Sequence, residues 1–447
     1  MKPHSLAGAL FGMLALASLP AIAQEAQKTA LPDTTKCPEA VADLATCYSA
    51  RLPTGAYLLA AMPRNWNGNL IVFAHGGPHI VPPAATTSQV DLQKYAVEVK
   101  LGYAWIASTY RREGYGVQMA AADTDDARRF FIERIAKPKR TLLHGASYGG
   151  LVGAKLLESH AVNAGGAPAY DGAMFNSSPV GGALNNYEFR ADLRVVYQYY
   201  CKNLPRPGEA QYPLWMGVPA DFKLSLAEIT ARVDECTGVA QPAGARTALQ
   251  KQNLANIVGV MHFPESMLVR HMQGATFVLR DLAQGLGRGR SVFSNMNVRY
   301  HGSNDDVALN RDVERFAADP GALAALTADG QPTGALPVPV VSIHSMNDPQ
   351  AAVEAQFEFR ERVGAAGNSN RLVQAYTDEN AHTAQSAAEL AAALDALMQW
   401  IETGTRPTPL SIAASCERIR ANLAGPCSYR PEYAPRPHST RYARSGH

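Results

Sequence analysis

A serine stands between two glycines in the segment Gly145-Ala146-Ser147-Tyr148-Gly149, and this segment joins two different structural patterns. The apolar run from Arg140 to His144 predicts a buried strand, and a helix-like run begins at Gly150. A strand that turns at once into a helix leaves no room for bulky neighbours, so glycines flank the serine and its hydroxyl stands clear of the sheet edge. The competing interpretation is a surface Gly/Ser turn, but the strand before and the helix after favour the sharp turn.

Short apolar runs alternate with helical patterns on both sides of this turn, which is typical of an α/β chain with a mostly parallel sheet. The predicted strands are 57–61, 69–74, 104–108, 140–144 and 173–175, and then 338–343 and 371–376. The predicted helices of the same pattern are 123–136, 351–363 and 387–402.

Three segments resemble a known superfamily. Gly145 to Gly150 is similar to the G-x-S-Y-G-G of prolyl oligopeptidase-type catalytic domains, and Tyr110–Gly116 is similar to an Arg- and Gly-rich turn of those domains. His75-Gly76-Gly77-Pro78 is similar to the oxyanion loop of proline iminopeptidases. The resemblance is to the α/β-hydrolase superfamily over roughly 55–180 and 336–402. It implies an α/β-hydrolase fold, in which helices flank a mostly parallel sheet, and hydrolysis through an acyl-enzyme without a cofactor.

The strand pattern breaks between the fifth and sixth predicted strands, and this break sets the expected domain organisation. We expect residues 24–179 to form the first part of the hydrolase core, 180–335 a large and mainly helical cap insertion, and 336–403 the second part of the core. Residues 404–447 are expected to be a tail clipped by a disulfide and disordered beyond Pro431. Residues 24–50 are polar and are expected to be rich in loops.

The N-terminal residues predict export. Lys2 precedes an apolar run from Leu6 to Leu19 that is too short for a membrane span, and Ala21-Ile22-Ala23 fits a cleavage site. Residues 1–23 are therefore a predicted signal peptide, and the protein is expected in the periplasm or outside the cell. No other run is long and apolar enough for a membrane span.

The six cysteines agree with an oxidising compartment. They fall into the local pairs Cys37 and Cys47, Cys201 and Cys236, Cys416 and Cys427, which favours three sequential disulfides. Six cysteines allow 15 pairings, so the connectivity stays open at this point. A zinc site is the alternative, but the chain contains no C-x-x-C spacing.

The formal net charge of +2 and the scattered arginines argue against a nucleic-acid surface. The chain has no phosphate loop, no dinucleotide fingerprint and no metal triad. We therefore expect a small-molecule partner, an ester or a peptide, and neither a cofactor nor a metal. The oligomeric state stays open.

A serine hydroxyl needs a base to take its proton, and the base needs an acid to orient it. In the α/β-hydrolase fold the chain order is serine, acid, histidine. Ser147 is the predicted nucleophile, Asp348 after the strand 338–343 is the predicted acid, and His382 after the last strand is the predicted base. Asp305 and Asp306 are alternative acids, but no strong strand pattern precedes them.

The tetrahedral intermediate needs two backbone N–H groups aimed at its oxyanion. We predict that they belong to Tyr148, directly after the nucleophile, and to Gly77, in the loop after the strand 69–74. The alternative for His75–Pro78 is an ordinary Gly-Pro turn. Among the other histidines, His144 is expected to be buried, His79 to line the site entrance, and His262 and His271 to lie in the cap within reach of a substrate.

The leading hypothesis is an exported serine carboxylesterase. The second is an exopeptidase, which would need a cap acid to hold the substrate amine, with Glu188, Asp192, Glu209 and Asp234 as candidates. The third is a binding protein that keeps the fold without catalysis.

Overall fold

The computed structural model describes residues 32–163 and 165–441, so the predicted signal peptide, residues 1–23, lies outside the described residues. The strands are β1 (Asp33–Thr35), β2 (Ala45–Arg51), β3 (Tyr57–Pro63), β4 (Asn69–Ala74), β5 (Ala104–Ser108), β6 (Arg140–Ala146), β7 (Gly172–Asn176), β8 (Val340–Ser345) and β9 (Leu372–Thr377). The α-helices are α1 (Thr87–Lys94), α2 (Val97–Lys100), α3 (Val117–Arg134), α4 (Tyr148–His160), α5 (Ala183–Cys201), α6 (Leu226–Thr237), α7 (Ala248–Met261), α8 (Leu268–Gln284), α9 (Asp306–Asp312), α10 (Pro320–Gly330), α11 (Ala355–Ala365), α12 (Ala387–Thr403) and α13 (Pro409–Ile419).

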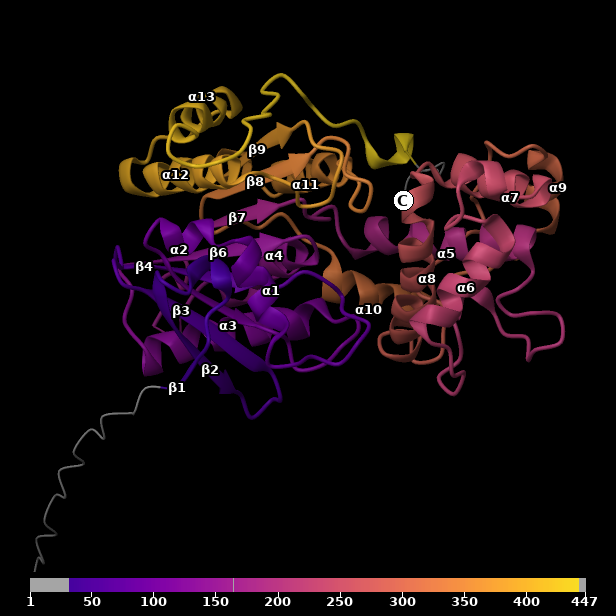
Figure 1. Cartoon of the computed structure of the whole chain (residues 1–447), viewed down its shortest axis with the longest axis horizontal. Coiled ribbons are helices and arrows are strands. Elements are labelled where there is room, and N and C mark those ends of the chain that lie inside the picture. The colour runs from indigo at the N-terminus through magenta and orange to yellow at the C-terminus, as the bar shows by residue number, and fades with distance from the viewer. Residues whose placement is uncertain (1–31, 164, 442–447) are drawn as a thin grey trace, which may run out of the picture. The chain divides into compact units, whose positions relative to one another are not determined.

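In the described part of the chain, nine strands form one sheet in the order β1-β2-β3-β5-β4-β6-β7-β8-β9. Figure 1 shows its last strands, β7, β8 and β9, side by side. The first three strands pair antiparallel with their neighbours, and the strands from β5 to β9 along the sheet pair parallel. The predicted mostly parallel α/β sheet is therefore confirmed.

The central strands are buried on both faces, which is why they read as continuous apolar runs. On β4, Leu70 and Val72 point into the core shared with α3 and α4, whereas Ile71 and Phe73 point into the core shared with α2 and α12. Alternate side chains of a strand face opposite sides of the sheet, so each strand contributes to both cores.

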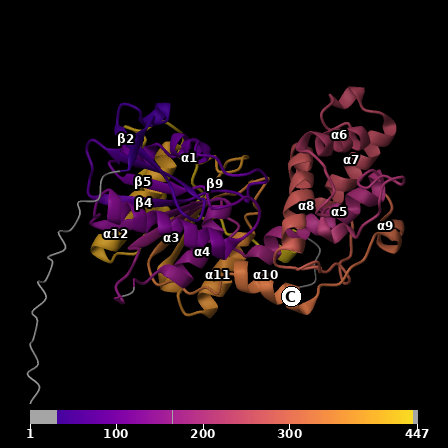
Figure 2. The same cartoon turned by 90° about the horizontal axis from the view of Figure 1, so that it is seen from below.

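The chain between β7 and β8 is mainly helical and holds α5 to α10. Helix α5 packs against α7 and α8, and α6 packs against the same two helices (Figure 2). The disulfide Cys201–Cys236 ties the last residue of α5 to α6. This segment falls where the cap insertion, residues 180–335, is expected; the division of the chain into domains stays a prediction.

The expectation of loops over residues 24–50 is wrong for β1 and β2. Strand β2 pairs with β3 along its whole length, from Ala45 opposite Pro63 to Arg51 opposite Tyr57. The sequence signal is weak because only Ala45 and Cys47 of this strand are buried. Backbone hydrogen bonds to β3 stabilise this strand. Such bonds join residues distant in the chain, so a local pattern does not reveal them.

The expectation of disorder beyond Pro431 is also wrong as far as Arg441. The Tyr433 ring lies 5.1 Å from the ring of Tyr376, and His438 is buried. Arg441 Nη1 lies 3.1 Å from a carboxylate oxygen of Glu354, in the loop before α11. Contacts with distant segments hold the tail in place, and composition does not predict such contacts.

The cysteines form the disulfides Cys37–Cys47, Cys201–Cys236 and Cys416–Cys427, so the predicted sequential pairing is confirmed and the zinc alternative is wrong. Among the described residues, no helix combines the length and the apolar character that a membrane crossing requires.

The turn from β6 into α4 brings the start of the helix against the end of β4. A Cβ atom on Gly149 would lie 1.9 Å from the carbonyl oxygen of Ala74, and one on Gly145 would lie 2.4 Å from the carbonyl oxygen of Gly149. Both obstacles are backbone atoms, so neither can rotate away. The glycines on either side of Ser147 are therefore required by the close approach of helix and sheet.

We expect Gly149→Ala to lower the free energy of unfolding by about 3 kcal/mol or more, because the added methyl group displaces α4 or β4. The matched control is Gly165→Ala, where a Cβ atom meets nothing within 4 Å and the change stays within about 1 kcal/mol. Urea unfolding followed by circular dichroism compares the two variants. Equal midpoints would show that the turn from β6 into α4 tolerates a side chain at Gly149.

Candidate active site

Ser147 occupies the turn between β6 and α4 with φ 55° and ψ −128°, a conformation that a non-glycine residue rarely adopts. Its backbone N–H donates to the carbonyl oxygen of Asn176 at 2.9 Å, at the end of β7. Strain of this kind persists only where the surroundings impose it, and it occurs often at functional sites.

His382 and Asp348 meet Ser147 at the carboxyl end of the parallel strands. Asp348 follows β8 and His382 follows β9, while Ser147 follows β6. His382 Nε2 lies 2.7 Å from Ser147 Oγ, and His382 Nδ1 lies 2.7 Å from Asp348 Oδ2. The three predicted residues thus form one hydrogen-bonded chain, because parallel strands end at the same edge of a sheet.

The carboxylate of Asp348 is held on both of its oxygens. Oδ2 faces His382, and Oδ1 accepts from the backbone N–H groups of Gln350 at 2.8 Å and Ala351 at 2.9 Å. Burial alone raises the pKa of Asp348, but the hydrogen bond and charge of His382 outweigh it, and the pKa lies below its ordinary value. The carboxylate is therefore ionised and fixed in orientation at neutral pH.

The loop that carries His382 is anchored by Gln385. Its Nε2 donates to Ser345 Oγ at 2.8 Å and to Ser177 Oγ at 3.2 Å, so it bridges the ends of β8 and β7. Thr383, next to the histidine, accepts from Lys94 of α1 and donates to the carbonyl oxygen of His382 at 2.7 Å. Sequence reasoning missed these anchors, since they depend on residues far apart in the chain.

The loop after β4 lies beside the first residue of α4. A Cβ atom on Gly77 would lie 3.5 Å from Cδ1 of Tyr148. Two hydrogen bonds fix the loop: Tyr110 Oη donates to the carbonyl oxygen of His75, and the Gly114 N–H donates to that of His79, both at 2.7 Å. Gly77 and Tyr148, the two predicted oxyanion donors, are thus neighbours next to Ser147.

A cavity of about 460 Å³ opens over Ser147 and His382. Its walls come from the loop after β4, from α1, and from α5 and α8 of the helical segment. His79 lines it, as expected, and so does His271. Burial lowers the pKa of His79 to about 4 and that of His271 to about 3, so both rings are neutral at pH 7.

An interaction that sequence reasoning missed lies on the same wall. Asp91 of α1 contacts Nδ1 of His75, and the His75 ring stacks on His79 with centroids 4.2 Å apart. A His-to-Asp spacing of 16 residues carries no motif, so only the fold reveals this pair. Asp91 is the single carboxylate among the described residues that line the cavity, and it contacts His75.

The acids proposed for an exopeptidase lie elsewhere. Within the described chain, none of Glu188, Asp192, Glu209 and Asp234 lines the cavity over Ser147. Asp192 accepts from Tyr300 Oη at 2.7 Å. The helical segment therefore offers the cavity none of the carboxylates that were candidates for holding a substrate amine.

The alternative acids Asp305 and Asp306 lie at the start of α9. Asp305 Oδ1 accepts from the Ala308 N–H at 2.9 Å and so caps the helix, and Asp306 Oδ1 accepts from the Ser303 N–H at 2.8 Å. Neither lines the cavity over Ser147. Asp348, by contrast, follows β8 and contacts His382.

Two further histidines lie outside the cavity. His144 on β6 is buried, with Nδ1 2.5 Å from Glu98 Oε1 and Nε2 2.9 Å from Asn176 Oδ1, as expected for a structural residue. His262 at the end of α7 is exposed and does not line the cavity. Of the two cap histidines, only His271 reaches the site.

Burial of His271 predicts a pH dependence of stability. Its pKa falls from 6.5 to about 3 on folding, so between pH 6.5 and about pH 3 the unfolded chain binds a proton that the folded chain excludes. Stability therefore declines as the pH falls, by up to about 1.4 kcal/mol per pH unit from this group. We expect His271→Gln to reduce that slope between pH 6 and pH 4, measured by urea unfolding. Parallel profiles for wild type and His271→Gln would contradict the assignment.

Comparison with known proteins gives similarity at the level of structure alone. No family model matches the chain, and no curated protein matches it in sequence. An esterase from Aspergillus oryzae is similar with a TM-score of 0.45 and 14% identity, over 81% of this chain and 80% of that one. Feruloyl esterase B from the same organism has a TM-score of 0.47 and 14% identity, over 86% of this chain and 89% of that one.

Candida antarctica lipase A has a TM-score of 0.41 and 13% identity, over 86% of this chain and 84% of that one. Because these scores and identities are low, the assignment of fold rests on this chain itself. The sheet order, the parallel strands from β5 to β9 and the turn at Ser147 together show that the chain has the α/β-hydrolase fold.

Proposed function

We propose that this protein is a serine hydrolase that cleaves carboxylic esters, with Ser147 as nucleophile, His382 as base and Asp348 as orienting acid. One observation carries the proposal. A single imidazole lies 2.7 Å from a serine hydroxyl on one side and 2.7 Å from a buried carboxylate on the other. Such a chain of hydrogen bonds is what activates a serine that is otherwise unreactive at neutral pH.

Acylation starts when Ser147 Oγ attacks the carbonyl carbon of the ester and His382 Nε2 takes the hydroxyl proton. Asp348 Oδ2 accepts from Nδ1–H, which leaves Nε2 free to act as the base and stabilises the imidazolium that forms. When the tetrahedral intermediate collapses, the bond to the alcohol oxygen breaks and Nε2 returns the proton to that oxygen. The acyl group remains on Ser147.

Deacylation repeats these steps with water. His382 Nε2 takes a proton from water, the resulting hydroxide adds to the acyl carbon, and the bond to Ser147 Oγ breaks as that oxygen regains the proton. In both steps the former carbonyl oxygen becomes negatively charged. We assign its stabilisation to hydrogen bonds from the backbone N–H groups of Tyr148 and Gly77. One such donor is worth on the order of 3 kcal/mol in the transition state.

Export is part of the proposal. The three disulfides fit an oxidising compartment, and the N-terminal pattern predicts a signal peptide. The esterase hypothesis is preferred over the exopeptidase because the four candidate acids for a substrate amine lie away from the cavity. A non-catalytic binding protein would have no need for the strained serine or the hydrogen-bonded triad.

We expect Ser147→Ala to lower kcat on short-chain 4-nitrophenyl esters by at least about 10³-fold, because the replacement removes the oxygen that forms the proposed acyl-enzyme. The melting temperature should stay near that of wild type, since the replacement removes one oxygen. Labelling of the wild-type protein by a fluorophosphonate, and its absence in the variant, checks the nucleophile independently. Wild-type protein without Ser147-dependent turnover on any acyl length would refute the esterase.

We expect Asp348→Asn to lower kcat by about 10³- to 10⁴-fold, because an amide in place of the carboxylate favours the wrong tautomer of His382. Asp305→Asn is the matched control, since asparagine also caps helices and Asp305 lies away from the cavity. Steady-state kinetics on one ester compares the two variants. A comparable loss in both would remove Asp348 from the proposed role.

A further inference from the structure

The cavity over Ser147 carries an excess of positive charge. Among the described residues that line it, Lys94, Arg190 and Arg270 are cationic, and Asp91 is the single carboxylate. Asp91 already contacts His75, and the neutral rings of His79 and His271 do not offset the cations. The balance of charge on the wall therefore favours an anion inside the cavity.

Arg270 lies on α8 at the side of the cavity formed by the helical segment. Its Nε donates to Gln350 Oε1 at 2.7 Å, which fixes the direction of the side chain beside the loop that carries Asp348. Within the described chain, no Asp or Glu oxygen lies within ion-pair distance of its guanidinium. The ends of the guanidinium are thus available for a planar anion, and arginine binds carboxylates through two parallel hydrogen bonds.

Lys94 is the last residue of α1 and also lines the cavity. Its ammonium donates to Thr383 Oγ1, next to His382. Burial lowers the pKa of Lys94 more than the charges of Asp91 and Asp348 raise it. The two carboxylates therefore compensate the positive charge of Lys94 only in part. No carboxylate of the described residues forms an ion pair with it. An anionic ligand would complete the compensation.

Arg190 of α5 contributes the third cation. Its guanidinium lies over the rings of Tyr187 and Phe189, at 5.0 and 4.7 Å from their centroids, and Nη1 donates to the carbonyl oxygen of Asn186 at 2.5 Å. These contacts hold the charge in one position at the cavity. Two cations from the helical segment and one from α1 thus line the cavity over Ser147.

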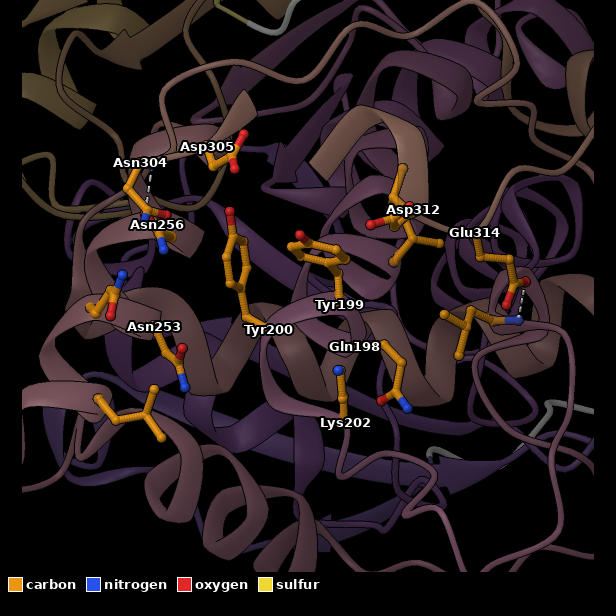
Figure 3. A pocket seen from close by; sticks show the side chains of 15 residues that line it. Gln198, Tyr199, Tyr200, Lys202, Asn253, Asn256, Asn304, Asp305, Asp312 and Glu314 are labelled. Carbon is orange, nitrogen blue, oxygen red and sulfur yellow. Dashed lines mark hydrogen bonds between the residues drawn. The ribbon is translucent and has the colours of Figure 1, made fainter. Parts of the chain in front are cut away.

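The structure has a second cavity, of about 660 Å³, whose lining differs in charge from that of the cavity over Ser147 (Figure 3). It lies in the helical segment, where the rings of Tyr199 and Tyr200 stand between Asp305 on one side and Asp312 and Glu314 on the other. Lys202 is its single cation among the described lining residues. This cavity has an acidic balance, so the basic character belongs to the site at Ser147.

We infer that the substrate is an ester that carries a carboxylate, in its acyl part or in its alcohol part, and that Arg270 and Lys94 select it. This inference rests on the proposed function and names its substrate class. A carboxylate that reaches Arg270 while the scissile carbonyl lies at Ser147 exchanges its hydration for charge-assisted hydrogen bonds, whereas an equally large neutral group leaves the cations uncompensated.

Matched substrates test the inference. The acyl arm compares the 4-nitrophenyl monoester of adipic acid with the corresponding ester of adipamic acid, which differs by an amide in place of the carboxylate. The alcohol arm compares butyrate esters of 3-hydroxybenzoic acid and 3-hydroxybenzamide. We expect kcat/KM to favour the acid in at least one arm by about 10- to 100-fold, as one charge-assisted hydrogen bond would give. The preference should shrink between about 20 mM and about 500 mM NaCl.

Two variants assign the preference to residues. Arg270→Gln and Lys94→Gln should each reduce the ratio of acid to amide turnover by about tenfold. Arg280→Gln, on the same helix as Arg270, and Lys202→Gln, in the second cavity, remove the same charges elsewhere and should leave the ratio and the turnover unchanged. An unchanged ratio in both site variants would overturn the assignment.

A binding measurement separates this inference from the proposed function. Calorimetry with the Ser147→Ala protein compares monomethyl adipate with methyl adipamate, and with the butyrate pair of the alcohol arm, so it reports even where no ester is hydrolysed. Tighter binding of an acid, lost in Arg270→Gln, supports the inference. Ser147-dependent turnover of the neutral esters without an acid preference in turnover or binding would overturn it and leave the esterase intact.

Discussion

The site depends on one chain of hydrogen bonds, from the Ser147 hydroxyl through His382 to the carboxylate of Asp348. Its three residues follow β6, β8 and β9, and only the parallel arrangement of those strands brings them together. The backbone N–H groups of Gln350 and Ala351 hold the far oxygen of the carboxylate, and Gln385 holds the histidine loop to the ends of β7 and β8. A displacement of any one strand end would break the chain of hydrogen bonds, so the packing of the whole sheet holds the three residues together.

The strain at Ser147 has a specific origin in that packing. Helix α4 starts where β6 ends, and Gly149 lies so close to the carbonyl oxygen of Ala74 that no Cβ atom fits. The serine is forced to a positive φ, which raises its hydroxyl towards His382 and away from the sheet. The glycines therefore permit a contact between helix and sheet that a larger residue would prevent.

The cavity over the serine is built from two parts of the chain with different tasks. The sheet and its loops supply the triad and the proposed oxyanion donors, while α5 and α8 supply Arg190, Arg270 and His271. The helical segment thus adds charge rather than reactive groups to the site. Selectivity for a substrate can change through these helices without disturbing the strand ends on which catalysis would depend.

Local patterns in the sequence determined the strands β4 and β5 to the residue. They also determined the turn at Ser147 and the identity of the triad candidates. Apolar periodicity and the order of motifs depend on neighbouring residues, so a local window contains them. Tertiary structure alone decided the formation of β2, the ordered tail up to Arg441, the contact between His75 and Asp91, and the meeting of Lys94 with Arg270 at one cavity. Those features arise from pairs of residues far apart in the chain, and their energies depend on packing and burial that no local window contains.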